Sequence, residues 1–386
     1  ALAIAARRTA ADCAERIDMF SSHLEAVITG DESPLPCGPV GRVDGRQRWL
    51  ITSDLHRCVP GRVDWPRRQR TKDLYADVLE RYADDGWGLI ENGDVEDFWM
   101  TSSNARDTAY DLARVLGAVT APVDPTLEME AMAAQLDRIV ENNQRIYGVI
   151  RERFAEPGRY HRTVGNHDEH MADPILAKRL RRHLPKTEPL DSILLVDPGT
   201  RRDPMQVTDR SDVMAVVTHG HLTDSWNGPG YSALGRAITW LGLGLDQLAA
   251  PRSSESLPDE QAVGRLLSGR GRNRLVGLDP RFGGNRRFDS LDEERLFRTL
   301  SRDEPEDGWP WLLFGHTHYP MLCPLDRDGN QTRYANSGTG VLDGAISALE
   351  WEPDAGMAPK LVLWLDTSDG PTRKQLVADG ATLQVV

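Results

Sequence analysis

The sequence predicts an α/β fold in which short strands alternate with helices and carry polar side chains at their carboxyl ends. The apolar segments 49–52 and 87–90 have the length and composition of buried strands, and apolar residues at helical spacing predict a helix over 72–85. Asp54 follows the first strand and Asp94 follows the second. Because functional groups of open α/β sheets lie outside the carboxyl ends of the strands, we expect a site at this edge.

Other apolar segments repeat this arrangement farther along the chain. Residues 160–164, 213–217 and 311–314 predict strands, and each leads directly into a motif that contains histidine. After residue 318 the chain again has strand-like segments, and we expect them to form a second sheet: 334–336, 348–351 and 361–365.

The domain organisation follows from the spread of the polar motifs. A chain of 386 residues is long enough for two or three domains. The motifs, however, run from Asp54 to His318, so most of the chain must converge on one site. We therefore predict an N-terminal helical appendage and linker over 1–45 and one domain over 46–386. Helical or loop insertions are expected at about 101–159 and 226–305.

Composition and charge restrict the class of protein. With 39% hydrophobic and 27% charged residues, the chain has the composition of an ordinary globular protein. Its net charge of −13 disfavours binding to nucleic acid through electrostatic attraction to the phosphate backbone. The four cysteines are too far apart for a zinc ribbon or a disulfide framework, which favours a cytoplasmic location. The longest apolar stretch, 237–248, is far short of the ~20 residues that a membrane span requires. Nothing in the sequence indicates an oligomeric state.

Histidine is concentrated in a few short motifs. The chain has ten histidines; six lie within five motifs, and a seventh, His170, lies beside one of them. Histidine, aspartate and asparagine at this density are the ligands that a site for two divalent cations needs. The motifs are Asp54-Leu55-His56, Gly93-Asp94-Val95-Glu96-Asp97, Gly165-Asn166-His167-Asp168, His219-Gly220-His221 and Gly315-His316-Thr317-His318.

These motifs resemble the signature of the calcineurin-like metallophosphoesterase superfamily. That signature reads D-x-H, G-D-x-x-D, G-N-H-[DE], H-G and G-H-x-H, and all five elements occur here in order, within residues 47–340. The resemblance implies a sandwich of two mixed β-sheets flanked by α-helices. It also implies hydrolysis of a phosphate mono- or diester through attack by a hydroxide that bridges two metal ions.

The expected metal ligands follow from the chemistry and from the resemblance. Two cations about 3.5–4 Å apart need a shared carboxylate, for which Asp94 is the best candidate. By resemblance, the first ion would take its other ligands from Asp54, His56 and His318. The second ion would take its other ligands from Asn166, His219 and His316. This nitrogen and oxygen set suits Mn, Fe, Zn or Mg, and we favour Mn.

Four further residues are candidates for catalysis or substrate binding. The resemblance implies that His167 donates a proton to the leaving group and that Asp97 orients it. Arg57, directly after the first motif histidine, could reach a phosphate oxygen or form a surface salt bridge. His221 is a candidate for substrate contact or for supporting a metal ligand.

Three functions remain open at this point. The first is a phosphoesterase acting on a small phosphorylated substrate. The second is a nuclease of the same superfamily, acting on DNA or RNA. Segment 265–287, with seven arginines and one acid, favours the nuclease if it is not simply a solvated loop, whereas the net acidity weighs against it. The third is a catalytically silent scaffold, which the complete set of motif residues disfavours.

Overall fold

The computed structural model describes most of the chain, in eleven stretches. They are 11–60, 69–99, 125–199, 203–207, 209–224, 293–318, 320–323, 332–341, 344–353, 358–379 and 382–385. The arginine-rich segment 265–287 and the apolar stretch 237–248 lie outside the described residues. So do residues 101–124 and 226–292 of the two expected insertions.

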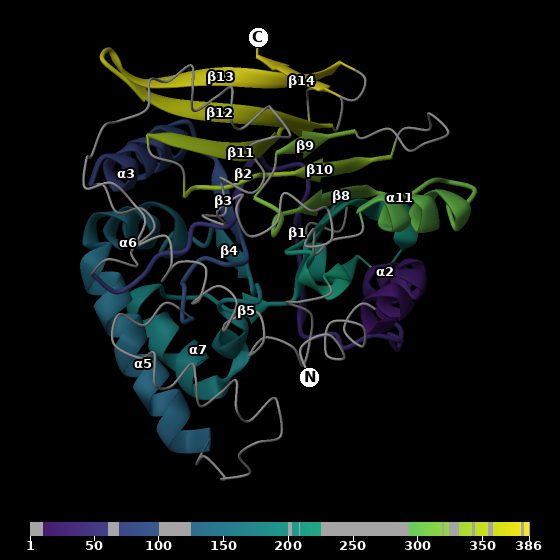
Figure 1. Cartoon of the computed structure of the whole chain (residues 1–386), viewed down its shortest axis with the longest axis horizontal. Helices are drawn as coiled ribbons and strands as arrows, with labels where there is room; N and C mark the ends of the chain where they lie inside the picture. The colour runs from purple at the N-terminus through teal and green to yellow at the C-terminus, as the bar shows by residue number, and fades with distance from the viewer. Residues whose placement is uncertain are drawn as a thin grey trace, which may run out of the picture.

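Two mixed β-sheets form the centre of the described structure (Figure 1). The six-stranded sheet has the order β1-β6-β7-β8-β10-β9, in which β1/β6, β7/β8 and β8/β10 are parallel pairs. Its strands are β1 (Val40–Asp44), β6 (Ser192–Val196), β7 (Val213–Thr218), β8 (Trp311–Phe314), β10 (Tyr334–Asn336) and β9 (Met321–Leu322).

The eight-stranded sheet has the order β14-β13-β12-β11-β2-β3-β4-β5. The pairs from β2 to β5 are parallel and the others are antiparallel. Its strands are β14 (Thr382–Val385), β13 (Gly370–Asp379), β12 (Pro359–Thr367), β11 (Ala345–Trp351), β2 (Trp49–Thr52), β3 (Gly88–Asn92), β4 (Tyr160–Thr163) and β5 (Pro189–Leu190). The prediction of an α/β sandwich of two mixed sheets is confirmed.

Helices cover the outer face of each sheet (Figure 1). The eight-stranded sheet carries α3 (Gln69–Asp84), α5 (Pro125–Asn142), α6 (Gln144–Ile150) and α7 (Pro174–His183). The six-stranded sheet carries α2 (Phe20–Thr29) and α11 (Glu293–Arg302). A π-helical turn, Arg151–Ala155, extends α6, and 3-10 turns lie at Glu169–Ala172, Pro204–Gln206, Arg210–Asp212 and His221–Thr223. Within the described residues, no helix has the length and apolar character to span a membrane.

The core has three layers because each sheet is apolar on both faces. Between the sheets, Ile51 and Leu363 of one sheet share a buried cluster with Val217 and Leu313 of the other. The outer face of the eight-stranded sheet packs on its four helices, and that of the six-stranded sheet packs on the N-terminal helices and α11. Burial on both faces explains why these strands read as continuous apolar runs in the sequence.

The N-terminal segment is packed into the sandwich. Phe20 of α2 contacts Phe314 of β8 edge to face, with ring centroids 6.0 Å apart. Strand β1 continues the six-stranded sheet by parallel pairing with β6. The domain boundary at residue 45 stays a prediction. On its N-terminal side, α2 covers the six-stranded sheet and β1 forms an edge strand of that sheet.

The strands expected after residue 318 all form, yet their assignment to one separate sheet is wrong. Strand β10 pairs with β8, whereas β11 pairs with β2 and β12 pairs with β11. They are thus divided between the two sheets, and each extends a sheet that already holds motif-bearing strands. The reason is that an apolar strand pattern shows burial but does not identify the pairing partner.

A buried ionic network lies between the eight-stranded sheet and its helices. The guanidinium of Arg162 donates to both carboxylate oxygens of Glu96 at 3.0 and 2.6 Å and to Asp168 at 2.7 Å, and all three side chains have 0% exposure. Beside it, Arg57 pairs with Glu91, which also accepts hydrogen bonds from Tyr75 and Tyr160. Buried charges of this kind are tolerated only when every member has a partner.

We predict that Arg162→Met destabilises the fold strongly. Methionine fills a similar volume but leaves Glu96 and Asp168 without their cation, and loss of one partner of a buried pair typically costs about 3–5 kcal/mol. The free energy of unfolding from urea titration measures the effect. Arg153→Met is the matched control, because Arg153 is 40% exposed and its pair with Asp84 should be worth at most about 1 kcal/mol. Equal losses in the two variants would contradict the prediction.

Candidate dinuclear metal centre

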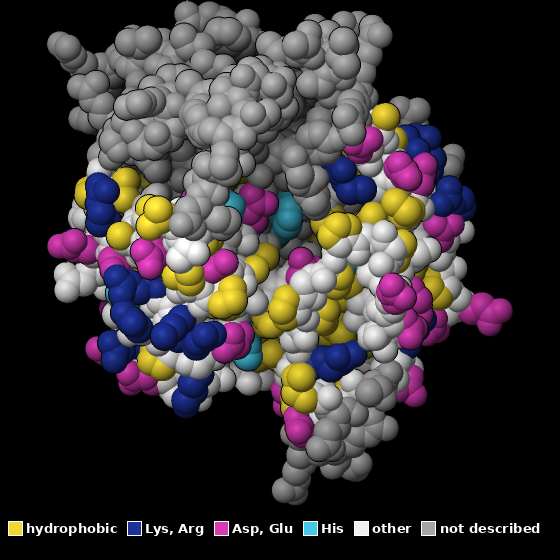
Figure 2. All heavy atoms as spheres, turned by 90° about the horizontal axis from the view of Figure 1, so that it is seen from below, with side chains coloured by type: hydrophobic (Ala, Val, Ile, Leu, Met, Phe, Trp, Pro, Cys, Tyr) yellow, Lys and Arg dark blue, Asp and Glu magenta, His cyan; other side chains and the backbone are white. Residues whose placement is uncertain are grey.

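All five motifs begin where a strand ends. Asp54 and Gly93 follow β2 and β3, Gly165 lies just beyond β4, and His219 and Gly315 follow β7 and β8. Since β2, β3 and β4 belong to one sheet and β7 and β8 to the other, the motifs meet where the two sheets face each other. Figure 2 shows histidine and acidic side chains near the centre of one face of the molecule.

Asn92, the last residue of β3, joins the two sheets beside the motifs. Its side-chain amide donates to the carbonyl oxygens of Thr218 and Leu313 at 3.0 and 3.3 Å, and its oxygen accepts from Thr163 at 2.8 Å. One buried side chain therefore connects strands β3 and β4 to β7 and β8. No local sequence pattern identifies this residue, because its partners lie more than seventy positions away.

Backbone strain is concentrated in the motifs. Among the described residues, seven other than glycine have a positive φ, and five of these are predicted ligands. Such conformations cost of the order of 1–3 kcal/mol each and persist where surrounding contacts impose them. The five are Asp54, His56, Asp94, His316 and His318, with φ from 44° to 69°.

The motif glycines allow close approach between the loops. A Cβ on Gly165 would fall against the carboxylate of Asp94 and 2.8 Å from the ring of His219. A Cβ on Gly315 would lie 2.8 Å from Asp54 Oδ2, where the amide of His316 now donates at 2.8 Å. Both positions exclude any larger residue because polar side chains occupy the space.

Asp54, His56 and His318 form the first group of candidate ligands. Their ligand atoms all lie within 4.8 Å of one another. His318 Nε2 is 3.3 Å from Asp54 Oδ1 and 3.1 Å from His56 Nε2. These are the three residues that the resemblance assigns to one ion, together with the shared Asp94, whose Oδ2 lies 3.7 Å from His56 Nε2.

Asp94, His219 and His316 form the second group, again with ligand atoms within 4.8 Å. His219 Nε2 lies 3.3 Å from Asp94 Oδ2, the carboxylate oxygen that also faces His56. Asn166 is 1% exposed, and the backbone amide of the next residue, His167, donates to Asp94 Oδ1 at 2.8 Å. Asp94 thus lies beside both groups, as a shared carboxylate requires.

Several ligand atoms are buried without a hydrogen-bond partner among the described residues. Buried polar atoms are nearly always paired, so a convergent set of exceptions indicates a bound ion or molecule. Each of these atoms can offer a lone pair to a cation. They are Asp54 Oδ1, Asn166 Oδ1, His219 Nε2 and His316 Nδ1.

Each candidate histidine ligand is held by its other ring nitrogen. An outer partner of this kind fixes the tautomer and orientation of a metal-binding imidazole. The four pairs are His56 Nδ1 with Asp97 Oδ2 (3.1 Å), His219 Nδ1 with the Asn92 carbonyl (2.9 Å), His318 Nδ1 with Thr339 Oγ1 (3.3 Å) and His316 Nε2 with Asp224 Oδ2 (2.6 Å). The residues present therefore fit two divalent cations.

The electrostatics of the cluster favour a cation. Burial disfavours the charged imidazole, yet the carboxylates of Asp97 and Asp94 outweigh it and raise the pKa of His56 to about 9. Burial also disfavours the charged form of His219, but the carboxylate of Asp94 outweighs this effect and raises the pKa of His219 to about 10. At His318 burial prevails and lowers the pKa to about 4. A divalent cation would supply the positive charge that these carboxylates otherwise obtain from protons.

His167 is held at the edge of the cluster. Its Nδ1 lies 3.1 Å from Asp97 Oδ1, and its ring stacks on Trp99 with centroids 3.8 Å apart. The His167 side chain is 11% exposed, close to the 10% of His318 and above the 5% of His56, so it is accessible to a bound molecule. Asp97 contacts both His56 and His167, which places it between a candidate ligand and the candidate proton donor.

The expectation for Arg57 is corrected by the structure. Its side chain is 1% exposed, pairs with Glu91 and lies over the rings of Tyr75 and Tyr147 at 5.6 and 5.0 Å. It therefore points into the helix-facing core and reaches neither a substrate nor the surface. His56, before it, has a positive φ, which changes side-chain directions from those of a regular strand.

His221 stays near the cluster. Its ring centroid is 5.6 Å from that of His219 and 6.5 Å from that of His316, and burial together with these two histidines lowers its pKa to about 3. A neutral imidazole at this position can accept or donate a hydrogen bond. Substrate contact by His221 remains a prediction.

Sequence reasoning missed four residues that support the site: Asn92, Trp99, Asp168 and Asp224. Asp168, within the third motif, accepts from the amides of Gly165 and Val95 at 2.6 and 3.1 Å and so ties two motif loops together. Its position within the third motif could have indicated that Asp168 supports the site. Trp99 and Asp224 lie just outside motifs, where nothing in the sequence separates them from core or surface residues.

No protein-family model matches the chain, and no curated protein sequence matches it. What indicates a metal centre is therefore the side chains themselves: two groups of candidate ligands, a carboxylate beside both, and buried candidate ligand atoms without hydrogen-bond partners among the described residues.

Proposed function

We propose that this chain is a metal-dependent phosphoesterase of the calcineurin-like metallophosphoesterase type, with a dinuclear centre. The observation that carries the proposal is the position of Asp94, which lies 3.7 Å from His56 in one ligand group and 3.3 Å from His219 in the other. A single buried histidine cluster has many uses. Two clusters that share a carboxylate suit two-metal hydrolysis of a phosphate ester.

We favour Mn²⁺ as the bound ion, with Fe, Zn and Mg as alternatives, although a nitrogen and oxygen ligand set does not by itself select one of these metals. When bound, two such cations would neutralise the phosphoryl oxygens and lower the pKa of the attacking water. The protein contributes fixed ligand positions, a site of low solvent exposure and a proton donor. Holding the reacting groups in place in this way removes much of the entropic cost of the reaction.

His167 is the proposed proton donor to the leaving oxygen. Asp97 and the stacked Trp99 restrict its ring, and the hydrogen bond from its own amide to Asp94 fixes its backbone against the ligand cluster. Nδ1 faces Asp97, which leaves Nε2 to face a substrate. The proposed substrate is a small phosphorylated molecule, contacted in addition by His221.

We predict that Asp94→Asn abolishes hydrolysis and lowers the bound Mn²⁺. Asparagine cannot supply a charged oxygen to two ions, and loss even of an outer partner lowers metal affinity about 10–100-fold. Metal content by mass spectrometry, with Mn²⁺-dependent turnover of p-nitrophenyl phosphate and bis-p-nitrophenyl phosphate, gives the measurement. Asp77→Asn on α3, 40% exposed, is the matched control. Normal turnover in Asp94→Asn would refute the site.

We predict that His167→Ala still binds both metal ions but hydrolyses esters more slowly, with the larger loss of rate for poor leaving groups. General acid catalysis typically contributes about 10²–10⁴-fold, and it matters most for a poor leaving group. Hydrolysis of phenyl phosphate should therefore fall far more than that of p-nitrophenyl phosphate. His170→Ala, three residues away, should change neither rate. Equal losses on both esters would exclude the proton-donor role of His167.

A further inference from the structure

Asp224 holds His316 through one of its two ring nitrogens, Nε2. Asp224 Oδ2 lies 2.6 Å from His316 Nε2, and the two side chains are 0% and 6% exposed. Asp224 belongs to none of the five motifs, since it follows the His219-Gly220-His221 motif by three positions. The contact joins the loop after β7 to the loop after β8.

This contact determines which nitrogen of His316 is available to a cation. An ionised carboxylate only accepts hydrogen bonds, so His316 Nε2 must carry the proton. In the neutral ring, Nδ1 then holds the lone pair. His316 Nδ1 is buried and has no hydrogen-bond partner among the described residues, and His316 belongs to the group with Asp94 and His219.

The loop that carries Asp224 is fixed by the N-terminal helical residues 11–18. Arg16 Nε donates to the carbonyl of Leu222 at 2.8 Å, and Arg16 Nη2 donates to the carbonyl of Asp224 at 2.6 Å. Cys13 Sγ donates to the carbonyl between them, that of Thr223, at 3.1 Å. Three consecutive buried carbonyls thus have partners more than two hundred positions earlier in the chain.

We infer that Asp224 is a positioning residue that presents His316 Nδ1 to one of the two metal ions, and that Arg16 holds Asp224 in place for this role. The inference rests on the proposed metal centre. It gives the N-terminal helix a function in metal binding that the motifs do not suggest. It also predicts that the two metal sites respond differently to the same substitution, since Asp224 supports only the group with His219 and His316.

The test is a calorimetric titration of Mn²⁺ into metal-free protein, which separates the affinities of the two ions. Asp224→Ala should lower the affinity for one Mn²⁺ ion about 10–100-fold and leave the affinity for the other ion unchanged. Asp224→Asn keeps a hydrogen-bond acceptor, so its Mn²⁺ affinity should fall less than that of Asp224→Ala. Circular dichroism checks that each variant is folded.

A double-mutant cycle separates positioning from direct ligation. If Asp224 acts through His316, then adding Asp224→Ala to His316→Ala causes no further loss of Mn²⁺ affinity. A further loss in the double variant would mean that Asp224 binds the ion itself. That result would overturn the positioning role.

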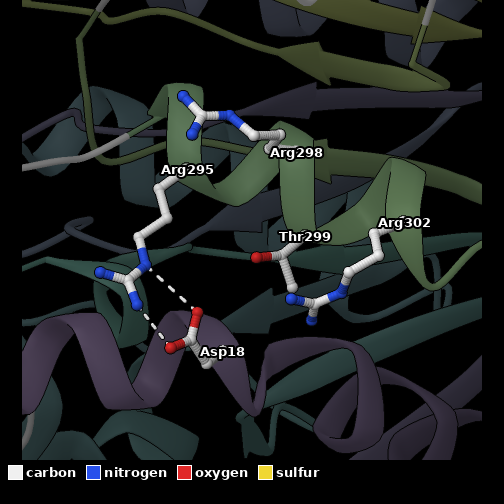
Figure 3. A pocket seen from close by; sticks show the side chains of 5 residues that line it. All are labelled: Asp18, Arg295, Arg298, Thr299 and Arg302. Atoms are coloured by element: carbon white, nitrogen blue, oxygen red, sulfur yellow. Dashed lines mark hydrogen bonds and ion pairs between the residues drawn. The ribbon is translucent and has the colours of Figure 1, made fainter.

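Arg16→Gln tests whether the N-terminal helix supports Asp224. It should lower the affinity for the same Mn²⁺ ion, by a smaller factor than Asp224→Ala does. Asp18→Ala is its control on the same helix. Asp18 pairs with Arg295 of α11 in a surface pocket (Figure 3), and it is 49% exposed. Its loss should leave both affinities unchanged. Normal affinities in Arg16→Gln would overturn the role of Arg16.

The outcomes for Asp224 and for the proposed function are distinguishable. Wild-type affinities for both ions in Asp224→Ala would overturn the inference, even with an active phosphoesterase. Two bound ions in the wild type without ester hydrolysis would overturn the function, while the Mn²⁺ affinities would still decide the role of Asp224. Fewer than two ions in the wild type would overturn both.

Discussion

Burial of the Asp94 carboxylate between two sheets is the constraint on which the rest of this structure depends. Asp94 is 1% exposed, and a carboxylate so removed from water is stable only beside positive charge and hydrogen-bond donors. The amide of His167 donates to one oxygen, while His219 and His56 face the other. Burial would raise the pKa of Asp94, but these histidines hold it well below its usual range. A cation pair would satisfy the same requirement.

The residues around Asp94 come from both sheets. The loops after β2, β3 and β4 bring Asp54, Asp94 and Asn166, and the loops after β7 and β8 bring His219 and His316. Asn92 connects the strands across this junction, and Arg162, which precedes its partner Thr163 on β4, forms buried ion pairs with Glu96 and Asp168. The left-handed ligand conformations are stabilised from outside, by packing of the sheets and by the outer partners of each histidine. The fold thus maintains a locally strained cluster.

The sequence allowed the α/β sandwich and the cluster of candidate ligands to be predicted, whereas the contacts that support this cluster could not be. Strands β2, β8 and β10 form at the predicted residues, because short runs rich in apolar and aromatic residues favour buried strands. Pairing was not predictable, so β10, β11 and β12 were expected in one separate sheet, whereas they are divided between the two sheets. Arg57 was expected at the site or at the surface, but its side chain is buried in a pair with Glu91, and the sequence does not reveal that partner. Asp224 and Arg16 meet across more than two hundred residues, and neither belongs to a motif.

Anomalous X-ray diffraction at the manganese edge, from crystals grown with Mn²⁺, tests the central claim most directly. The account predicts two peaks with Asp94 between them. One should be bordered by Asp54, His56 and His318, and the other by Asn166, His219 and His316. No peak in this cluster, or a single ion that leaves Asp94 without contact to it, would contradict the dinuclear centre.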